Sequence, residues 1–169
     1  MTWLAVALLA FVASVLIAGR AGIFSGKEPI DLGVKAGRLK PPSVTENSVS
    51  SQAGLHPGHP MRAYADIAPF EFAGEGAAAI TRLRRIIETT AGARIVRAEP
   101  KYLYAQFETR WLRFVDDAEF YADDALKLIH VRSASRLGSK DFGVNRARIE
   151  AMRARLDAPA LSGVFPNEH

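Results

Sequence analysis

The sequence predicts an α+β fold, in which an N-terminal transmembrane helix precedes an antiparallel sheet of about four to five strands with two main helices packed on it. Three observations lead to this prediction. The chain starts with a long apolar run without charge. Four short segments with strand-like alternation follow one another between residues 93 and 135, and their short connections favour antiparallel pairing. Helical patterns precede and follow these strands, which is typical of a sheet with helices on one face.

The apolar run, WLAVALLAFVASVLIAG, covers residues 3–19. A helix over residues 2–24 would span roughly 30 Å, about the thickness of a bilayer core. We therefore expect a membrane anchor or signal segment in residues 1–24. An anchor is favoured, because no basic segment precedes the run and its length exceeds the ~7–15 apolar residues usual in a signal peptide. A cleaved signal peptide and a buried helix of a soluble protein stay as alternatives.

Residues 25–60 are expected to form a tether and an N-terminal motif, because Gly, Pro and Ser are frequent there and no regular period persists. Val44 and Val49 offer apolar anchors through which this segment can still pack on the domain. Five Lys or Arg residues and only two acidic residues lie between residues 20 and 40. By the positive-inside rule this charge flank would place the domain in the cytoplasm.

An α+β domain is expected over residues 61–157 and a tail over residues 158–169. Helical spacing of apolar residues predicts a helix over 75–90 that ends at Gly92. Alternation predicts strands over 93–98, 102–111, 114–122 and 127–135. In the second strand one face is expected to carry Leu103, Ala105, Phe107 and Trp111. A last helix is expected over 141–156, with the apolar stripe Ile149, Met152 and Leu156.

Composition excludes several classes of site. The chain has no cysteine, which excludes disulfides, cysteine metal sites and a thiol nucleophile. The net charge of +4 is too small to indicate a nucleic-acid partner, and none is expected. His56 and His59 in HPGH lack a third ligand nearby, so the motif is interpreted as a surface turn. We expect neither a metal site nor a cofactor.

The stretch RSASRLGSKDFGVNRARIE, residues 132–150, is the most distinctive part of the chain. Residues 130–155 carry a net charge of +5, whereas residues 106–124 carry −4. Since these segments are expected to be neighbours, acidic groups of one are predicted to pair with arginines of the other. The candidate ligand-binding, partner-binding or structural residues are Arg132, Ser133, Ser135, Arg136, Asp141, Asn145, Arg146, Asp116 and Asp117.

Local rules add detail to this candidate site. Asp141 or Ser139 is expected to cap the last helix, and Arg146 to pair with Glu150 at i, i+4. Asn145 lies on the apolar stripe, so its amide needs partners, for which the backbone of residues 136–139 is the first candidate.

Catalytic arrangements in this region are disfavoured by strand geometry. Asp116 and Asp117 are adjacent on a strand, so they point to opposite faces and do not form an acid/base pair. Ser133 and Ser135 share one face of the last strand, whereas His130 lies on the other, which disfavours a Ser–His–Asp site. No catalytic residue is therefore assigned.

Three stretches together resemble the bacterial and plastid family known as domain of unknown function 1499. They are LRFVDDAEF, residues 112–120; HVRSASRLGSKDFGVNRARIE, residues 130–150; and NSVSSQA, residues 47–53, where members often have Cys at the place of Ser48. The resemblance spans roughly residues 40–156. It implies an α+β domain behind an N-terminal membrane or export segment, and no established activity. It also favours the extracytoplasmic side, against the charge flank.

Two functions are kept as hypotheses. The first is a membrane-tethered, non-catalytic binding or assembly module whose protein partner meets the sheet face and the Arg136–Asn145 turn, with the domain on the periplasmic side. Tyr102 and Tyr104 are expected to line the second face of the sheet, either as a ligand groove or as a partly exposed packing surface. The second is a binder of, or an enzyme acting on, a small anionic ligand, with Arg132, Arg136 and Arg146 as clamps. In both, the N-terminal helix contacts the membrane.

Overall fold

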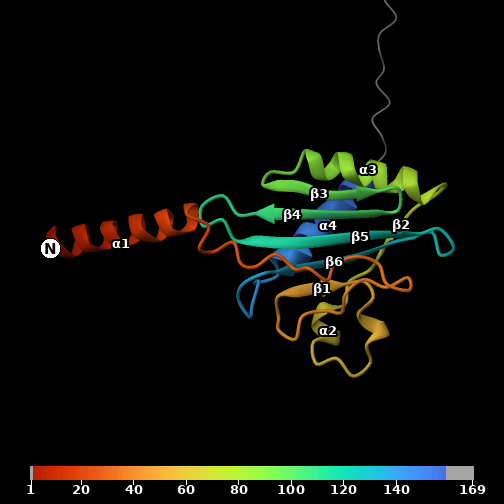
Figure 1. Ribbon diagram of the computed structural model, residues 1–169, viewed down its shortest axis with the longest axis horizontal. Helices are drawn as coiled ribbons and strands as arrows, with labels where there is room; N and C mark the ends of the chain where they lie inside the picture. Colours follow the sequence, from red (N-terminus) through yellow and green to blue (C-terminus); the bar gives the residue numbers. More distant parts are fainter. Residues whose placement is uncertain (1, 159–169) are drawn as a thin grey trace, which may run out of the picture.

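The computed structural model describes residues 2–158 and confirms the α+β fold. An apolar helix, α1 (Thr2–Arg20), extends away from a domain built on one antiparallel sheet (Figure 1). The strands are β1 (Ser48–Ser50), β2 (Phe70–Glu71), β3 (Ala93–Glu99), β4 (Tyr102–Glu108), β5 (Val115–Asp123) and β6 (Leu128–Ser135). The further helices are η1 (Ala53–Leu55), α2 (Arg62–Ala65), α3 (Gly76–Glu88) and α4 (Val144–Asp157).

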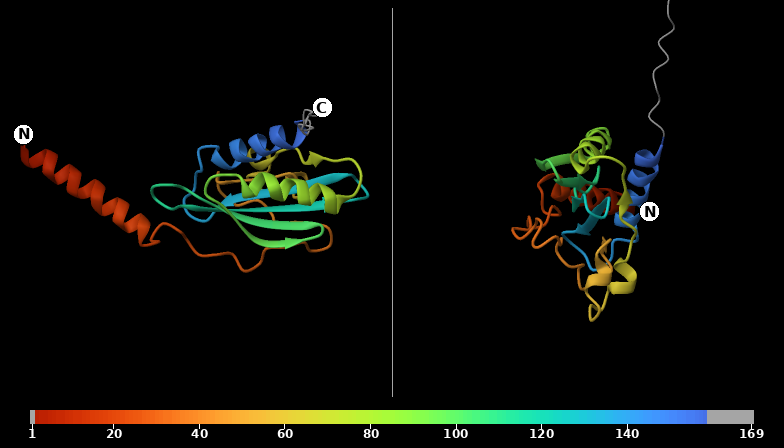
Figure 2. Two further views of the ribbon diagram at one scale, coloured as in Figure 1. Left: turned by 90° about the horizontal axis from the view of Figure 1, so that it is seen from above. Right: turned by 90° about the vertical axis from the view of Figure 1, so that its right-hand side faces the viewer.

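The sheet has the strand order β1-β6-β5-β4-β3, and β2 pairs with one end of β6. Strands β3 to β6 are hairpin neighbours, as the short connections predict. Helices α3 and α4 cover one face, and the segment that leads from α1 to β1 runs along the other (Figure 2). The sheet is therefore covered on both faces.

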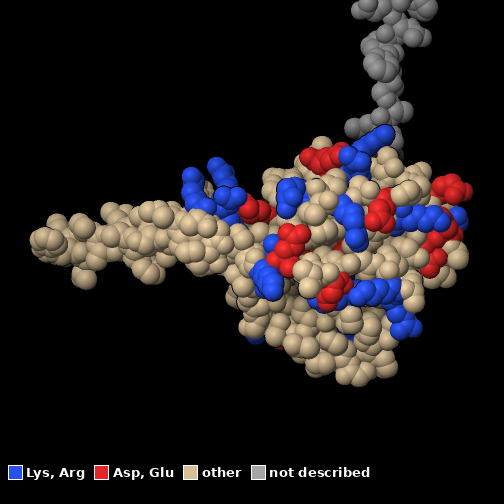
Figure 3. Space-filling view, in the orientation of Figure 1, with Lys and Arg blue, Asp and Glu red and all other residues tan. Residues whose placement is uncertain are grey.

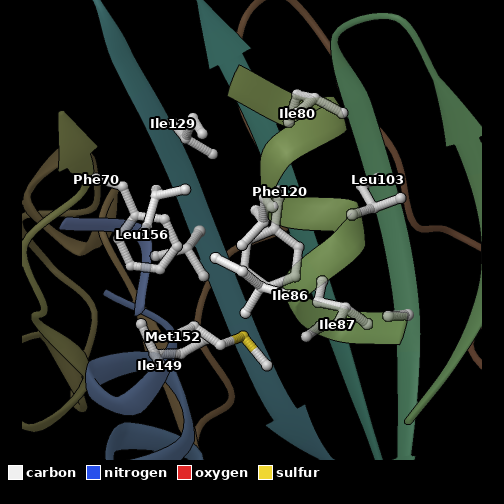
Figure 4. Packing of buried hydrophobic residues seen from close by; sticks show 14 of the residues in the cluster. Phe70, Ile80, Ile86, Ile87, Leu103, Phe120, Ile129, Ile149, Met152 and Leu156 are labelled. Carbon is white, nitrogen blue, oxygen red and sulfur yellow. The ribbon is translucent and has the colours of Figure 1, made fainter. Parts of the chain in front are cut away.

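The main core lies between the sheet and the two long helices. Ile86 and Ile87 of α3 lie beside Phe120 of β5, and Ile149 and Met152 of α4 belong to the same cluster (Figure 4). All five side chains are buried. Truncating a buried side chain of this size to Ala typically costs about 2–5 kcal/mol, so this layer dominates the stability of the domain.

A smaller cluster covers the second face. Tyr102, Tyr104 and Leu39 are buried there, with Leu32 and Tyr121 packed against them. Residues 31–41 thus form a strap across the face that the tyrosines were expected to line. Of the two alternatives for these tyrosines, the packing surface is correct, but the strap buries both side chains, which were expected to be partly exposed.

Several boundaries differ from the predicted ones. Strand β4 ends at Glu108, so Trp111 lies in the turn to β5 and is exposed instead of continuing the apolar face. Helix α4 begins at Val144, because Phe142 and Gly143 adopt left-handed backbone conformations with φ of 53° and 81°. Strands β1 and β2 were not predicted. The division into domains stays a prediction, but β1 lies within the range assigned to the tether, and Val49 is buried.

Among the described residues, α1 is the one helix long and apolar enough to cross a membrane. Its 19 residues correspond to about 28 Å of helix. Length and composition fit both a membrane anchor and a signal sequence, and the side on which the domain lies stays a prediction. Most of the predicted tail lies outside the described residues.

Candidate functional site

Asp116 and Asp117 divide the candidate site into two halves, because adjacent residues of β5 point to opposite faces of the sheet. Asp116 faces α4, where its carboxylate pairs with Arg148 at 2.5 Å. Asp117 faces the strap, where it pairs with Arg136 at 2.7 Å. The predicted pairing between the acidic and basic segments therefore exists, and it takes place on both faces.

The helix-side half is centred on Asn145, which is fully buried. Its Oδ1 accepts a hydrogen bond from Ser133 Oγ at 2.5 Å, and its Nδ2 donates to Ser135 Oγ at 3.0 Å. The same Nδ2 lies 3.2 Å from the carbonyl oxygen of Asn47 and 2.9 Å from Asp141 Oδ2. The amide thus binds β6 and the start of β1. The expectation that residues 136–139 supply its partners is wrong.

Helix α4 has Gly143 at its N-cap position, and Asp141, the predicted cap, binds the start of the helix from two residues before it. Its carboxylate accepts hydrogen bonds from the backbone N–H groups of Asn145 and Gly143, each at 3.0 Å, and from the Tyr64 hydroxyl at 2.9 Å. Burial alone would raise the pKa of Asp141, but these donors outweigh burial and lower it. A filled cap of this kind has little capacity left for an external anion.

The arginines of α4 differ from the prediction in their partners. Arg146 donates to the backbone carbonyls of Tyr64 and Asp66, not to Glu150, which pairs with Arg153 at 2.8 Å. Arg148, which was not among the candidates, binds Asp116 and also lies over the ring of Phe107 at 4.7 Å. Its position three residues after Asn145, on the same helix face, is the signal that identifies it.

The strap-side half holds Asp117 in a cage of donors. Arg136 binds both carboxylate oxygens, at 2.7 and 2.8 Å, and the Tyr104 hydroxyl donates at 2.5 Å. Burial, and then the bond to Asp117, raise the pKa of Tyr104 to about 12. The bond to Asp117 raises the pKa of Arg136, because the carboxylate stabilises the charged guanidinium.

Glu119 is a buried carboxylate that the sequence pattern did not single out. Its Oε1 accepts hydrogen bonds from the Gly33 N–H at 2.7 Å and the Tyr102 hydroxyl at 2.8 Å. Its Oε2 has no hydrogen-bond partner among the described residues. Burial raises the pKa of Glu119. The alternation of Asp117, Glu119 and Tyr121 along one face of β5 is the signal that could have found it.

Arg132 lies opposite Glu119 on the neighbouring strand. It is buried, and its Nε donates to the carbonyl oxygen of Pro41 at 3.0 Å. Burial lowers its pKa, although Glu119 opposes this effect. The three arginines proposed as anion clamps therefore do not converge: Arg132 lies against the end of the strap, Arg136 lies beside Gly26 and Glu28, and Arg146 lies against α2. Their assignment as ligand contacts stays a prediction.

A pocket of about 270 Å³ opens beside the Arg136–Asn145 turn. It lies between the β4–β5 turn and the loop from β6 to α4, and its apolar lining includes Phe114, Val115, Leu137, Phe142 and Val144. Phe142 is 93% exposed, and Leu137 and Val144 are partly exposed. An exposed aromatic residue with a positive φ is uncommon, because the left-handed conformation is unfavourable for a bulky side chain.

The histidines considered as metal ligands or as part of a catalytic site have other contacts. Within 2–158 there is no group of three or more His, Cys, Asp or Glu side chains that could hold a metal ion. His59 Nδ1 accepts a hydrogen bond from the Met61 N–H within its turn. His130 stacks on Tyr121 and bonds Ser51, on the face away from Asn145 and its two serine partners.

Comparison with known proteins gives one match. Residues 38–156 match the model of the family described as "Protein of unknown function (DUF1499)". No curated protein and no solved structure matches the chain. The matched region contains the strap end at Leu39, both halves of the candidate site and the whole sheet.

Proposed function

The chain belongs to the DUF1499 family, and from this premise we propose that it is a membrane-tethered binding module whose site is the apolar pocket beside the Arg136–Asn145 turn. The polar residues of the turn hold the pocket in shape, and the apolar residues at its edge make the contact. Helix α1 keeps this site at a membrane. The domain is placed on the extracytoplasmic side, which family resemblance favours.

The proposal rests on a contrast within the turn: its polar side chains already have hydrogen-bond partners, whereas several of its apolar side chains are exposed. Asp117 and Arg136 bind each other, and the side chain of Asn145 is hydrogen-bonded to five other residues. Phe142 and Leu137 point their apolar surface outwards at the same turn. Since a pocket with a few polar groups and an apolar lining is the common form of a binding site, this pocket is favoured.

A small anionic ligand is less well supported by the same contacts. An anion clamp requires guanidinium groups that can turn to a ligand, whereas Arg136 is held by a carboxylate and Arg146 by two backbone carbonyls. Releasing Arg136 would leave Asp117 buried without its counter-charge, which is strongly unfavourable. We therefore assign the turn a structural role and the pocket the binding role.

Native mass spectrometry of the full chain, extracted from membranes in a mild detergent, tests this function. The wild-type protein is expected to retain an apolar compound as a discrete added mass. Val144→Trp introduces a large side chain at the half-exposed edge of the pocket, so the variant is expected to fold but to lose the added mass.

Leu126→Trp is the matched control, because Leu126 is an exposed aliphatic residue in the β5–β6 turn, at the other end of the sheet. This variant should retain the same added mass as the wild type. Absence of any added mass from the wild type, or equal retention by Val144→Trp, would contradict the proposed site.

A further inference from the structure

The end of α1 is packed directly on the pocket-bearing end of the domain. At Gly19 the helix approaches the β4–β5 turn so closely that an added Cβ would lie 2.9 Å from the carbonyl oxygen of Leu112. The ring of Phe24 stacks on Phe114, with centroids 5.3 Å apart. At Gly26 the chain passes against Arg136 and Leu137. The two loops that enclose the pocket are therefore the parts of the domain nearest to α1 (Figure 1).

Large apolar side chains are exposed on the same two loops. Trp111 in the β4–β5 turn is 60% exposed, and Phe142 in the β6–α4 loop is 93% exposed. Leu137 is partly exposed between them in the chain, and Ile23 is exposed just after α1. Exposed aromatic residues on two loops at one end of a domain indicate an interaction surface more strongly than exposed apolar residues scattered singly.

The polar residues at this end suit a lipid headgroup region. Arg20 lies in the last turn of α1, and the guanidinium of Arg110 lies 5.0 Å from the ring of Trp111. Lys and Arg side chains gather where α1 meets the domain (Figure 3). Tryptophan with adjacent cationic side chains is the composition that membrane interfaces favour, because the ring is amphipathic and the headgroups carry phosphate.

Geometry excludes most other occupants of this surface. If α1 crosses the bilayer, Arg20 marks the membrane boundary, and Gly19 already touches the β4–β5 turn. A helix rises about 1.5 Å per residue, so the turn lies within a few ångströms of the headgroups. A folded protein partner does not fit in that space.

We propose that this end of the domain rests on the lipid bilayer, with Trp111, Leu137 and Phe142 inserted in the interfacial region and the pocket open to the acyl chains. The apolar group bound by the pocket is then a lipid hydrocarbon chain. This inference rests on the proposed function, because it requires α1 to be a membrane anchor.

Fluorescence quenching in vesicles tests the contact. The chain has two tryptophans, so Trp3→Phe leaves Trp111 as the single fluorophore of the full-length protein. The protein is reconstituted in phosphatidylcholine–phosphatidylglycerol vesicles with and without bromine atoms on the acyl chains. Trp111 is expected to lose emission to bromines near the headgroups more than to bromines near the bilayer centre, and to be protected from aqueous acrylamide.

A control variant reports on the opposite end of the domain. Leu126→Trp, in a chain with both native tryptophans replaced by Phe, carries its fluorophore in the exposed β5–β6 turn. It is expected to be quenched by acrylamide and not by brominated lipid. Equal bromine quenching at both positions would overturn the proposed orientation.

A variant that keeps only Trp3 distinguishes two outcomes: absence of membrane contact at Trp111, and absence of membrane insertion of α1. In Trp111→Phe, Trp3 is the single fluorophore and lies in α1. Bromine quenching of Trp3 without quenching of Trp111 would overturn the membrane contact and leave the tether intact. Absence of quenching at Trp3 would overturn the tether itself. Protection of Trp111 from acrylamide without bromine quenching would identify a protein partner or a second copy as the covering surface, against the inference.

Discussion

Asp117 shows how this domain accommodates charge in its interior. The carboxylate is 2% exposed, yet it receives two hydrogen bonds from Arg136 and one from Tyr104. Desolvation of an ion pair offsets much of its Coulombic attraction, so the pair is weak evidence for net stability. Removal of one partner is strongly destabilising, because the other charge then stays buried without a counter-charge.

We expect Arg136→Ala to lower the free energy of unfolding by about 3–5 kcal/mol, since Asp117 loses its counter-charge. Urea denaturation at neutral pH measures this change. The matched control is Arg113→Ala, which removes an exposed ion pair with Glu108 at 2.8 Å. Exposed ion pairs are screened by solvent and contribute little to stability, so the control should change little. Equal effects of the two substitutions would contradict the stabilising role of the buried Arg136–Asp117 ion pair.

Glu119 gives the fold a pH dependence of opposite sign to that of an ordinary paired carboxylate. Burial raises its folded-state pKa, so the folded protein binds more protons than the unfolded chain above the ordinary pKa of 4.5. The stabilisation is fully present below the unfolded pKa and is lost as pH rises through the folded one. Glu119→Gln removes this contribution.

The free energy of unfolding of the wild type, minus that of Glu119→Gln, is therefore expected to fall as pH rises from about 4.5. Its slope has an upper limit of about 1.4 kcal/mol per pH unit for one proton. Urea denaturation between pH 4.5 and 8 measures it, and taking the difference removes the contribution of other titrating groups such as His130. A difference that is constant with pH would show that Glu119 is not responsible.

At the scale of elements, the link between α3 and β3 depends on one glycine. Gly92 has a φ of 74°, and a Cβ there would overlap with the carbonyl oxygen of Glu108, across the β3–β4 hairpin. Gly92→Ala is expected to destabilise the domain by at least about 1–2 kcal/mol from the left-handed backbone alone. Gly54→Ala is the control, because no atom lies within 4 Å of its added Cβ. The thermal unfolding midpoints of both variants test this prediction. Similar midpoints for Gly92→Ala and Gly54→Ala would refute the role of Gly92.

The elements that could be predicted from sequence are those with a local signal. Helix α3 and strands β3 to β6 each carry a sustained apolar period, and their boundaries were close to those observed. Strand β1 has three residues, two of them serines, and its pairing partner β6 lies about eighty positions later. No local pattern identifies such a strand, because its stability comes from tertiary hydrogen bonds.

The sequence predicted several residues of the candidate site, but it predicted less of how these residues are arranged. The charge balance predicted that the two aspartates pair with Arg132, Arg136 or Arg146; Asp117 does pair with Arg136, but Asp116 pairs with Arg148, which was not a candidate. Strand alternation correctly separated Asp116 from Asp117. The roles of Asn47 and the strap were not predictable, because both reach the site from the N-terminal segment. Long-range contacts of this kind require the fold itself.

At the scale of the whole molecule, the N-terminal segment joins α1 to the domain as a packed strap. Gly33 binds Glu119, the Leu39 N–H binds Gln52, and Pro41 binds Arg132. A strap packed in this way fixes the orientation of the domain relative to α1, whereas a free linker would allow the domain to rotate. If α1 spans a membrane, the topology of α1 and its charged flank decides the side on which the domain lies.

Cysteine labelling decides that side, because the chain contains no native cysteine. We expect Leu126→Cys, on the exposed β5–β6 turn, to react with a membrane-impermeant maleimide in intact spheroplasts. Thr2→Cys, at the far end of α1, should react only after the membrane is opened. Labelled Thr2→Cys of full-length mass would also show that α1 is retained as an anchor. The five basic residues between residues 20 and 40 favour the reverse topology, because moving such a flank across the membrane opposes the positive-inside rule. Reaction of Thr2→Cys alone in intact spheroplasts would establish that reverse topology and place the domain, with its pocket, on the cytoplasmic surface.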